Sequence, residues 1–292
     1  FYAGLCHGCA NACGTIQRNK DGRVVNVEGN PDHPTGPGLC VRGHFDLVGA
    51  YGPDRLEGPQ SGGKALSWEE AQAQVNAAIS AARSAGKSVA WLGRYRTGSV
   101  AALLEHLGAT VGLRRVHWEA GGLESLLAAA RSAYGLDEAP QYRLDEARTI
   151  VSFGMDFLGT AFDSMRMIKG WSKAKNPSMG GFVARVVAIG PRVGVSESQS
   201  DHWYAPNPGT EGKVALALAK LCADAKGYAG PAASLLSGVD VSAAAQASGI
   251  AEEKLKEIAG WLAAEASVVL PNGPANSGAD GSAVAIATLL VN

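Results

Sequence analysis

The N-terminal region carries four cysteines, Cys6, Cys9, Cys13 and Cys40, in the spacing C-x2-C-x3-C-x26-C. The first three lie within one short segment, LCHGCANACG, and the fourth comes from a later segment, LCVRG. Three thiolates on one turn and a fourth from a second loop can occupy the four corners of a cubane iron–sulfur cluster. The spacing therefore predicts a [4Fe–4S] site with these four residues as its ligands.

Glycines accompany both cysteine segments. Gly8 and Gly14 lie beside the first three cysteines, and Gly38 and Gly43 flank the fourth. Residues without a side chain allow the backbone to approach closely, so that amide groups can face the sulfide ions. This pattern favours a backbone wrapped around a cluster.

Two other uses of the cysteines remain open at this point. A structural zinc site usually takes two C-x2-C pairs on separate knuckles, and this chain has one such pair. Two disulfides are the other alternative, if the protein is exported. In either case the chain would be a scaffold without redox chemistry.

The composition of the chain limits the kinds of partner that we expect it to bind. Of the 292 residues, 46% are hydrophobic and 18% charged, as in an ordinary well-buried globular protein. A net charge of −1 gives no basic field, so we expect neither nucleic acid nor an anionic membrane surface as a partner. No apolar run approaches the ~20 residues of a transmembrane helix. The sequence begins at Phe1 rather than at a translation start, so a removed export signal remains open.

Residues 1–60 are expected to form a small β-rich domain that holds the cluster. Thr15–Arg18 and Arg23–Glu28 read as the strands of a hairpin, with Asp21-Gly22 as the tight turn. A Gly/Pro-rich loop then delivers Cys40. The polar, turn-forming stretch Tyr51–Lys64 reads as the domain boundary.

Beyond residue 64, apolar patterns alternate between helix and strand. Ser67 with Glu70 forms a capping box that predicts the start of the first helix. The strands read as continuous apolar runs, typical of a parallel sheet covered by helices on both faces. We expect a doubly wound, mostly parallel α/β domain over residues 65–292, with its ligand crevice beyond the carboxyl ends of the strands. The expected strands are 88–93, 149–154, 182–191 and 267–273, and the expected helices are 67–86, 99–107, 122–134, 160–171, 252–264 and 282–290, with another from about residue 210.

The chain resembles the N-terminal half of the molybdopterin oxidoreductase superfamily along essentially its whole length. The resemblance rests on the two cysteine motifs, VEGNPDHP, YGPDRLEGP, FGMDFLGT, and the segment from Ala188 to Ala219. It implies that the four cysteines hold a [4Fe–4S] cluster. It also implies that Arg42, two places after the last cysteine, lies between the cluster and a pterin, where a cation stabilises the reduced cluster.

Two departures from the family pattern bear on the chemistry. The position of the side chain that binds molybdenum in catalytic members falls at or very near Gly122, which offers no ligand. Glu119, Glu124 or Ser125 could substitute only after a shift of a few residues. Family enzymes continue past residue 292 into the rest of the cofactor domain and a C-terminal barrel-like domain, so the sequence either covers part of a longer protein or belongs to a reduced relative. From the glycine at the ligand position, we expect no bound molybdopterin.

The run RLDEARTIVSFGMDFLGTAFDSMRMIKGW resembles the molybdenum-free large subunits of alternative complex III and of the quinone reductase complex. That subgroup implies a subunit on the periplasmic face of the cytoplasmic membrane. Its implied partners are a ferredoxin-like iron–sulfur subunit, a c-type cytochrome and an integral membrane quinone-binding subunit. Retention of all four cysteines favours the quinone reductase type.

Several other residues have competing explanations. Asp156, after a predicted strand, is the best candidate to contact a nucleotide-like arm if a pterin cofactor is bound. His7 and His44 flank cluster cysteines but are expected to pack near the cluster, since four thiolates are present. His202 and Trp203 match a loop on the pterin side in the family, or otherwise pack locally. Cys222 lies on an apolar helical face and reads as a buried structural thiol.

Three functions follow, and metal content separates them. The first is an iron–sulfur electron-transfer and structural subunit of a membrane-associated quinone oxidoreductase complex, with no independent active site. The second is a catalytic molybdenum or tungsten bis-pterin oxidoreductase subunit whose C-terminal part is not shown. The third is a pure scaffold with zinc or disulfides. Iron and sulfide alone indicate the first, molybdenum or tungsten the second, and neither iron nor molybdenum the third.

Overall fold

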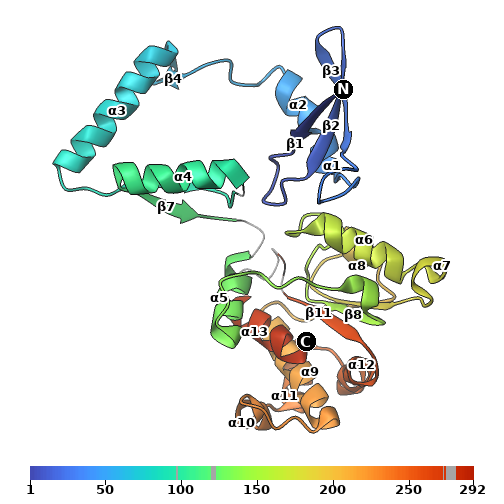
Figure 1. Cartoon of the computed structure of the whole chain (residues 1–292). Coiled ribbons are helices and arrows are strands. Elements are labelled where there is room, and N and C mark those ends of the chain that lie inside the picture. Colours follow the sequence, from blue (N-terminus) through green and yellow to red (C-terminus); the bar gives the residue numbers. More distant parts are fainter. Residues whose placement is uncertain (97, 120–122, 272, 274–280) are drawn as a thin grey trace. The chain divides into compact units, whose positions relative to one another are not determined.

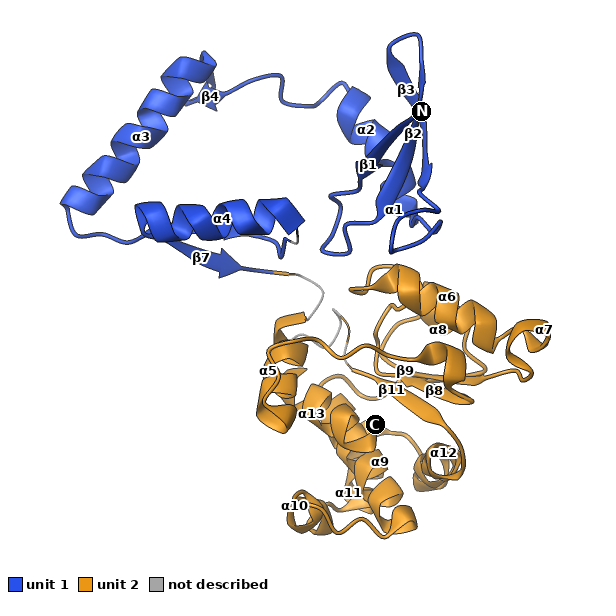
Figure 2. Ribbon diagram, in the orientation of Figure 1, with its two compact units in different colours: residues 1–118 blue, residues 119–292 orange. Residues whose placement is uncertain are grey.

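The computed structural model describes residues 1–96, 98–119, 123–271, 273 and 281–292. The chain divides into two compact units, Phe1–Trp118 and Glu119–Asn292 (Figures 1 and 2). The boundary expected near residues 60–65 falls inside the first unit.

The first unit begins with a three-stranded antiparallel sheet and continues with helices and short strand pairs. Its strands are β1 (Tyr2–Leu5), β2 (Gly14–Lys20), β3 (Arg23–Gly29), β4 (Gln60–Ser61), β5 (Lys64–Ala65), β6 (Val89–Gly93) and β7 (Leu113–His117). Its helices are α1 (Val41–His44), α2 (Asp46–Tyr51), α3 (Trp68–Ser84) and α4 (Gly98–Val111).

The predicted hairpin is confirmed, since β2 pairs with β3 in an antiparallel register. Asp21 and Gly22 both have positive φ, 52° and 81°, as a tight type I′ hairpin turn requires. Strand β1, which the sequence pattern did not reveal, pairs antiparallel with β2 on its other edge. The order β1-β2-β3 brings the segments before and after the cysteine loop together.

The first helix of the α/β pattern starts as predicted. Ser67 Oγ accepts a hydrogen bond from Glu70 N at 3.1 Å, and Glu70 Oε2 accepts one from Ser67 N at 2.8 Å. Strand β6 was expected to be buried, but its residues alternate between half-buried and exposed, with Leu92 70% exposed. The reason is that β6 pairs only with β7, in parallel, so this two-stranded sheet leaves much of its surface uncovered.

The second unit contains the larger sheet. Its strands are β8 (Thr149–Ser152), β9 (Arg185–Ile189), β10 (His202–Tyr204) and β11 (Ser267–Leu270). Its helical elements are α5 (Leu123–Tyr134), the 3-10 turn η1 (Leu144–Glu146), α6 (Ser164–Ala174), α7 (Pro177–Gly180), α8 (Val195–Ser198), α9 (Glu211–Lys226), α10 (Ala233–Ser237), α11 (Val241–Ser248), α12 (Glu252–Ala264) and α13 (Gly281–Val291). Within the described ranges, no helix combines the length and apolar character needed to cross a bilayer.

The four strands are all parallel, in the order β10-β9-β8-β11, and helices cover both faces. Alternate residues of one strand join different cores: Val151 packs with α9, α12 and α13, whereas Ile150 packs with α6 and η1. This alternation is the expected period of two along a strand. The predicted α/β fold with a parallel sheet is confirmed.

The strand order reverses at β8. From β8 the chain moves to β9 and β10 on one side, and later returns to place β11 on the other. In a doubly wound sheet the ligand crevice lies at such a switch point, beyond the carboxyl ends of the strands. Gly273 lies there against the loop after β8, because a Cβ on it would come within 2.1 Å of Gly154 O.

Leu218 of α9 is 1% exposed in the core that α9 shares with the sheet. Replacing it with Ala should lower the free energy of unfolding by about 2–5 kcal/mol, because the lost methyl groups leave a cavity. Urea denaturation followed by far-ultraviolet circular dichroism measures this. Leu235→Ala in α10 is the matched control, since that side chain is 62% exposed, and should change stability by less than about 0.5 kcal/mol. Equal losses in both variants would contradict this core assignment.

Candidate metal centre

The first three cysteines lie on a closed loop between β1 and β2. Cys6 N donates to Cys13 O at 2.9 Å, which closes the loop where the two strands meet. Ala12 adopts a left-handed conformation with φ 45°, so the chain turns sharply just before Cys13. Gly8 N lies 3.4 Å from Cys6 Sγ, as an amide that donates to the sulfur.

The four thiols share one electrostatic environment. Burial, together with the smaller effect of the neighbouring thiols of Cys9, Cys6 and Cys40, raises the pKa of Cys13 to about 11. Burial also raises the pKa of Cys6, although the Gly8 amide opposes this shift. All five cysteines of the chain are free. The structure thus brings together the four cysteines that the sequence grouped, although they come from two segments.

The loop that delivers Cys40 lies against the cysteine loop. A Cβ on Gly14 would come within 2.3 Å of His33, so only glycine fits beneath that side chain. Gly14 N donates to Thr35 Oγ1 at 3.2 Å, and the His33 Nδ1 and Thr35 Oγ1 atoms are 2.9 Å apart. The VEGNPDHP segment therefore positions the second loop beside the first.

The residues after Cys40 take two roles. The His44 Nδ1 is 2.8 Å from Val27 O, so this ring joins α1 to β3 rather than pointing at a metal. Arg42 is exposed on α1. His7 is exposed on the cysteine loop. That both histidines pack near the cluster stays a prediction.

Sequence reasoning missed two arginines beside the cysteine loop. Arg94 Nη1 donates to Gly8 O at 2.9 Å, and Arg96 Nη1 donates to His7 O at 3.2 Å. Both follow β6 at its carboxyl end, within the segment GRYR. The sequence shows two cationic side chains directly after a predicted strand, which is where ligand-binding residues often lie in α/β folds. Only the folded structure shows that they contact the cysteine loop.

The donor set fits an iron–sulfur cluster. Four cysteine thiols are the ligand complement of a [4Fe–4S] centre, and an amide already faces one of the sulfurs. In the part of the chain that the structure describes, no three His, Cys, Asp or Glu side chains group closely enough to hold one metal ion. A cubane makes a different demand, because each thiolate binds its own iron. The residues that would hold the cluster are Cys6, Cys9, Cys13 and Cys40.

Asp156 organises the loop after β8. Its Oδ2 accepts hydrogen bonds from Thr160 N at 2.9 Å and Thr160 Oγ1 at 3.0 Å, and its Oδ1 accepts one from Ser196 Oγ at 2.9 Å. Ser196 Oγ also accepts from Leu158 N at 3.0 Å. A Cβ on Gly159 would come within 2.3 Å of Asp156 Oδ2. This carboxylate, at the switch point, is therefore engaged mainly by its own loop.

The remaining candidates lie in the second unit. His202 and Trp203 form part of β10 rather than a loop, with the His202 ring stacked on Trp261 at 5.1 Å and Trp203 Nε1 donating to Gly190 O at 3.1 Å. Cys222 is buried among the α9 core residues, as expected. These contacts are those of structural residues.

The position expected to bind molybdenum, Gly122, lies outside the described residues. Of the possible substitutes, Glu124 accepts a hydrogen bond from Glu119 N at 2.6 Å, at the start of α5. Ser125 lies in the same turn. The Glu124 carboxylate therefore accepts a hydrogen bond from the backbone of the segment before this helix.

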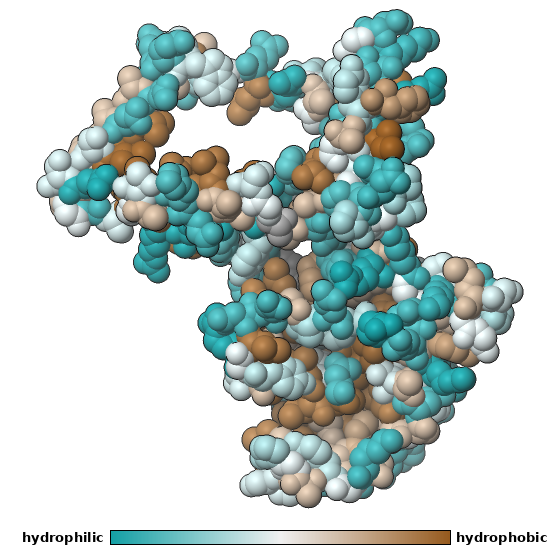
Figure 3. Space-filling view, in the orientation of Figure 1, coloured by the Kyte–Doolittle hydropathy of each residue, from teal (hydrophilic) through white to brown (hydrophobic). Residues whose placement is uncertain are grey.

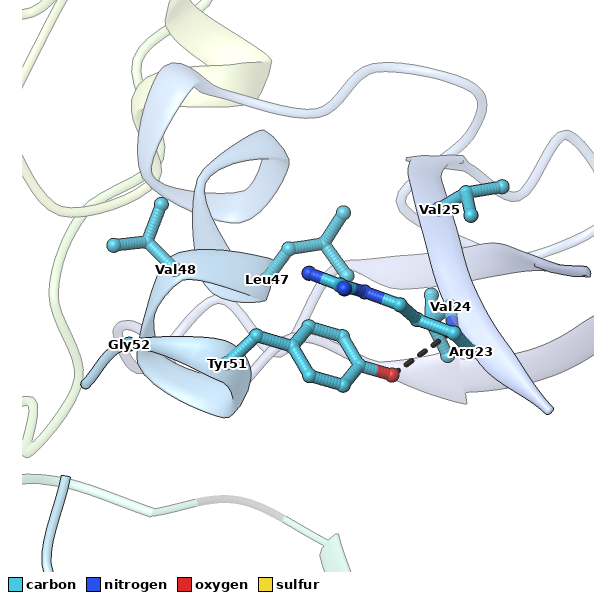
Figure 4. A pocket seen from close by; sticks show the side chains of 7 residues that line it. All are labelled: Arg23, Val24, Val25, Leu47, Val48, Tyr51 and Gly52. Carbon is cyan, nitrogen blue, oxygen red and sulfur yellow. Dashed lines mark hydrogen bonds between the residues drawn. The ribbon is translucent and has the colours of Figure 1, made fainter.

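A hollow of about 590 Å³ lies between β3 and α2 of the first unit (Figure 4). Arg23 stacks over the Tyr51 ring at 4.6 Å, and the Tyr51 hydroxyl accepts a hydrogen bond from Val24 N at 2.9 Å. Apolar side chains supply most of the lining, including Val25, which is 45% exposed, and Val48, which is 61% exposed. The hairpin thus carries an apolar hollow edged by one cation.

Two family models match the chain, and together they identify it. The molybdopterin oxidoreductase Fe4S4 domain matches residues 1–47, and the molybdopterin oxidoreductase model matches residues 60–251. The chain belongs to the molybdopterin oxidoreductase family.

Curated relatives are similar over about three quarters of the chain. The thiosulfate reductase molybdopterin-containing subunit PhsA of Salmonella typhimurium is 26% identical over 238 residues, which are 77% of this chain and 30% of that protein. The menaquinone reductase, molybdopterin-binding-like subunit of Nitratidesulfovibrio vulgaris is 27% identical over 222 residues, 73% of this chain and 31% of that protein. The chain spans less than a third of the length of these relatives.

A solved structure supports the fold. Acetylene hydratase from Pelobacter acetylenicus superposes with a TM-score of 0.73 at 12% identity, over 99% of this chain and 42% of that one. At this identity the likeness concerns the fold alone. This chain, with its small β-rich N-terminal region and parallel α/β sheet, therefore shares its fold with that protein.

Replacing Asp156 with Ala should lower the free energy of unfolding by about 1–3 kcal/mol, mainly because the hydroxyl of buried Ser196 loses its acceptor. Amide hydrogen exchange of residues 158–161 should quicken. Asp156→Asn keeps one acceptor oxygen and should lose less on both measures. Unchanged exchange in Asp156→Ala would show that the carboxylate does not hold this loop.

Proposed function

We propose that this chain is an iron–sulfur electron-transfer and structural subunit of a membrane-associated quinone oxidoreductase complex. The observation that carries the proposal is the convergence of Cys6, Cys9, Cys13 and Cys40 in a region that matches the family's Fe4S4 domain. When bound, the cluster supplies one-electron transfer. The four thiolates hold it, the Gly8 amide donates to a sulfur, and Arg42 adds positive charge on the neighbouring helix.

The absence of independent substrate chemistry is part of the proposal. It rests on the glycine that the family pattern places at the molybdenum position, and on Asp156, whose carboxylate serves its own loop. One of the similar proteins is named a molybdopterin-binding-like subunit of a menaquinone reductase. That name accords with a relative that keeps the fold in a quinone-linked complex.

The second candidate is a catalytic molybdenum or tungsten bis-pterin subunit. Two observations favour it: residues 60–251 match the molybdopterin oxidoreductase model, and a similar protein is named a molybdopterin-containing thiosulfate reductase subunit. A pterin would lie at the switch point beside β8 and β11. Metal analysis of the purified protein separates the two functions.

The proposed partners are a ferredoxin-like iron–sulfur subunit, a c-type cytochrome and an integral membrane quinone-binding subunit, on the periplasmic side of the cytoplasmic membrane. A single cluster needs an electron donor and an electron acceptor close to it. The surface also exposes apolar side chains that a partner protein can cover. Figure 3 shows hydrophobic patches on both units. The cluster region alone exposes Val25, Val41, Phe45, Val48 and Tyr51, some of them around the hollow beside Arg23. Such side chains favour burial against another protein.

Replacing Cys9 with Ser should remove the broad visible absorption of a [4Fe–4S] centre and lower the iron and sulfide content, since one ligand is lost. The N-terminal region should also become less stable, because so small a domain depends on the cluster as a staple. Cys222→Ala is the control, because that thiol lies in the α9 core, and it should retain full iron and sulfide. A Cys9→Ser protein with full iron and sulfide would refute the ligand assignment.

Metal analysis of the protein purified from its native membrane should find iron and sulfide without molybdenum or tungsten. Gentle detergent extraction should co-purify redox subunits, because a lone cluster exchanges electrons only with centres close to it. Molybdenum or tungsten in stoichiometric amount would refute this function and support the bis-pterin enzyme instead. Recovery as a stable monomer with no redox partner would contradict the place in a complex.

A further inference from the structure

We propose that Arg94 and Arg96 clamp the cysteine loop and raise the reduction potential of the cluster it holds. The pair is called the arginine clamp below. This inference rests on the proposed function, since it requires the cluster to be present. It adds two residues from the α/β part of the chain to a site that the family pattern places in the N-terminal segment.

The clamp is anchored on one side by β7. The Tyr95 ring stacks on His117 with the ring centroids 4.6 Å apart and an angle of 10° between the planes. Trp91 meets the same His117 edge-on at 6.4 Å. Tyr95 thus contacts β7, while its two neighbours in the chain, Arg94 and Arg96, reach the cysteine loop.

The clamp holds the two carbonyls between Cys6 and Cys9. Arg96 Nη1 donates to His7 O, and Arg94 Nη1 donates to Gly8 O. In a planar trans peptide, the carbonyl and the following N–H point in opposite directions. Fixing the His7 carbonyl therefore aims the Gly8 N–H away from Arg96, and that N–H lies 3.4 Å from Cys6 Sγ. The clamp sets the direction of an amide that faces a ligand sulfur.

The clamp also brings charge to the site. Guanidinium groups stay protonated under all ordinary conditions. A reduced cluster carries one more negative charge than an oxidised one, so nearby cations and hydrogen bonds to sulfur stabilise the reduced form. A cavity of about 80 Å³, lined by Cys9, Tyr95 and Arg96 among others, lies next to this contact. Arg96 thus lines the same cavity as the proposed ligand Cys9.

The experiment uses the full chain, loaded with its cluster, and a redox titration followed by visible absorption and electron paramagnetic resonance. Arg94→Gln and Arg96→Gln should each lower the ratio of reduced to oxidised cluster at a fixed potential by about threefold. For a one-electron couple this corresponds to about 28 mV toward negative potential, at 59 mV per tenfold change. Arg83→Gln is the control, because it removes the same charge from the last turn of α3. We expect it to change the ratio of reduced to oxidised cluster by less than half as much as Arg94→Gln or Arg96→Gln does.

Lysine variants separate the outcomes. Arg94→Lys and Arg96→Lys keep the charge and a donor, and should retain a potential close to that of the unmodified chain. If a Gln variant fails to take up iron, the Lys variant at the same position is the test. A Lys variant that binds the cluster with a near-normal potential supports the clamp. A Lys variant that also stays empty overturns it, as do Gln variants that titrate like Arg83→Gln. An unmodified chain that holds no iron refutes the proposed function instead, before any variant is compared.

Discussion

The four thiols are the central constraint on the N-terminal region, because this region has almost no other core. Of the first 50 residues, six are buried: Cys6, Cys13, Gly14, Thr15, Val27 and Gly43. Two are proposed ligands and two are glycines, so large apolar side chains contribute little. Burial of these thiols, and to a lesser extent their grouping, disfavours ionisation, as the raised pKa of Cys13 shows. Binding of a cluster by the four thiolates would release these protons and join both loops, which would couple metal binding to folding.

The second unit derives its stability differently. Its parallel sheet has two apolar faces, and the Val151 and Ile150 cores show that each face has its own helices. At the switch point, the loop after β8 is fixed by contacts within the protein. Gly273 approaches Gly154 closely, and Asp156 uses three of the roughly four acceptor positions of its carboxylate on Thr160 and Ser196. A ligand there would meet a loop already shaped by its own hydrogen bonds.

Local sequence patterns predicted the structural features that depend on residues close together in the sequence. The hairpin turn at Asp21-Gly22 and the capping box at Ser67 depend on neighbours in sequence, and both are confirmed. Strands β7 and β10 were missed because they are short and half exposed, without a continuous apolar run. The contacts of Arg94 and Arg96 span more than 80 residues, so no spacing rule could indicate them. The resemblance to a family predicted that the cysteines bind a cluster, but it did not predict the contacts of these arginines.

Arg94 and Arg96 connect the cysteine loop to the later part of the first compact unit, which extends to Trp118. The two family models leave the segment between residues 47 and 60 as a boundary, and the predicted domain limit lies nearby. The contacts to His7 and Gly8 cross that boundary, because they start from the strand pair β6–β7. The geometry of the cysteine loop therefore depends on the α/β part of the chain. Residues 1–60 taken alone would carry the four thiols but would lack the cations of Arg94 and Arg96 and their hydrogen bonds to the cysteine loop.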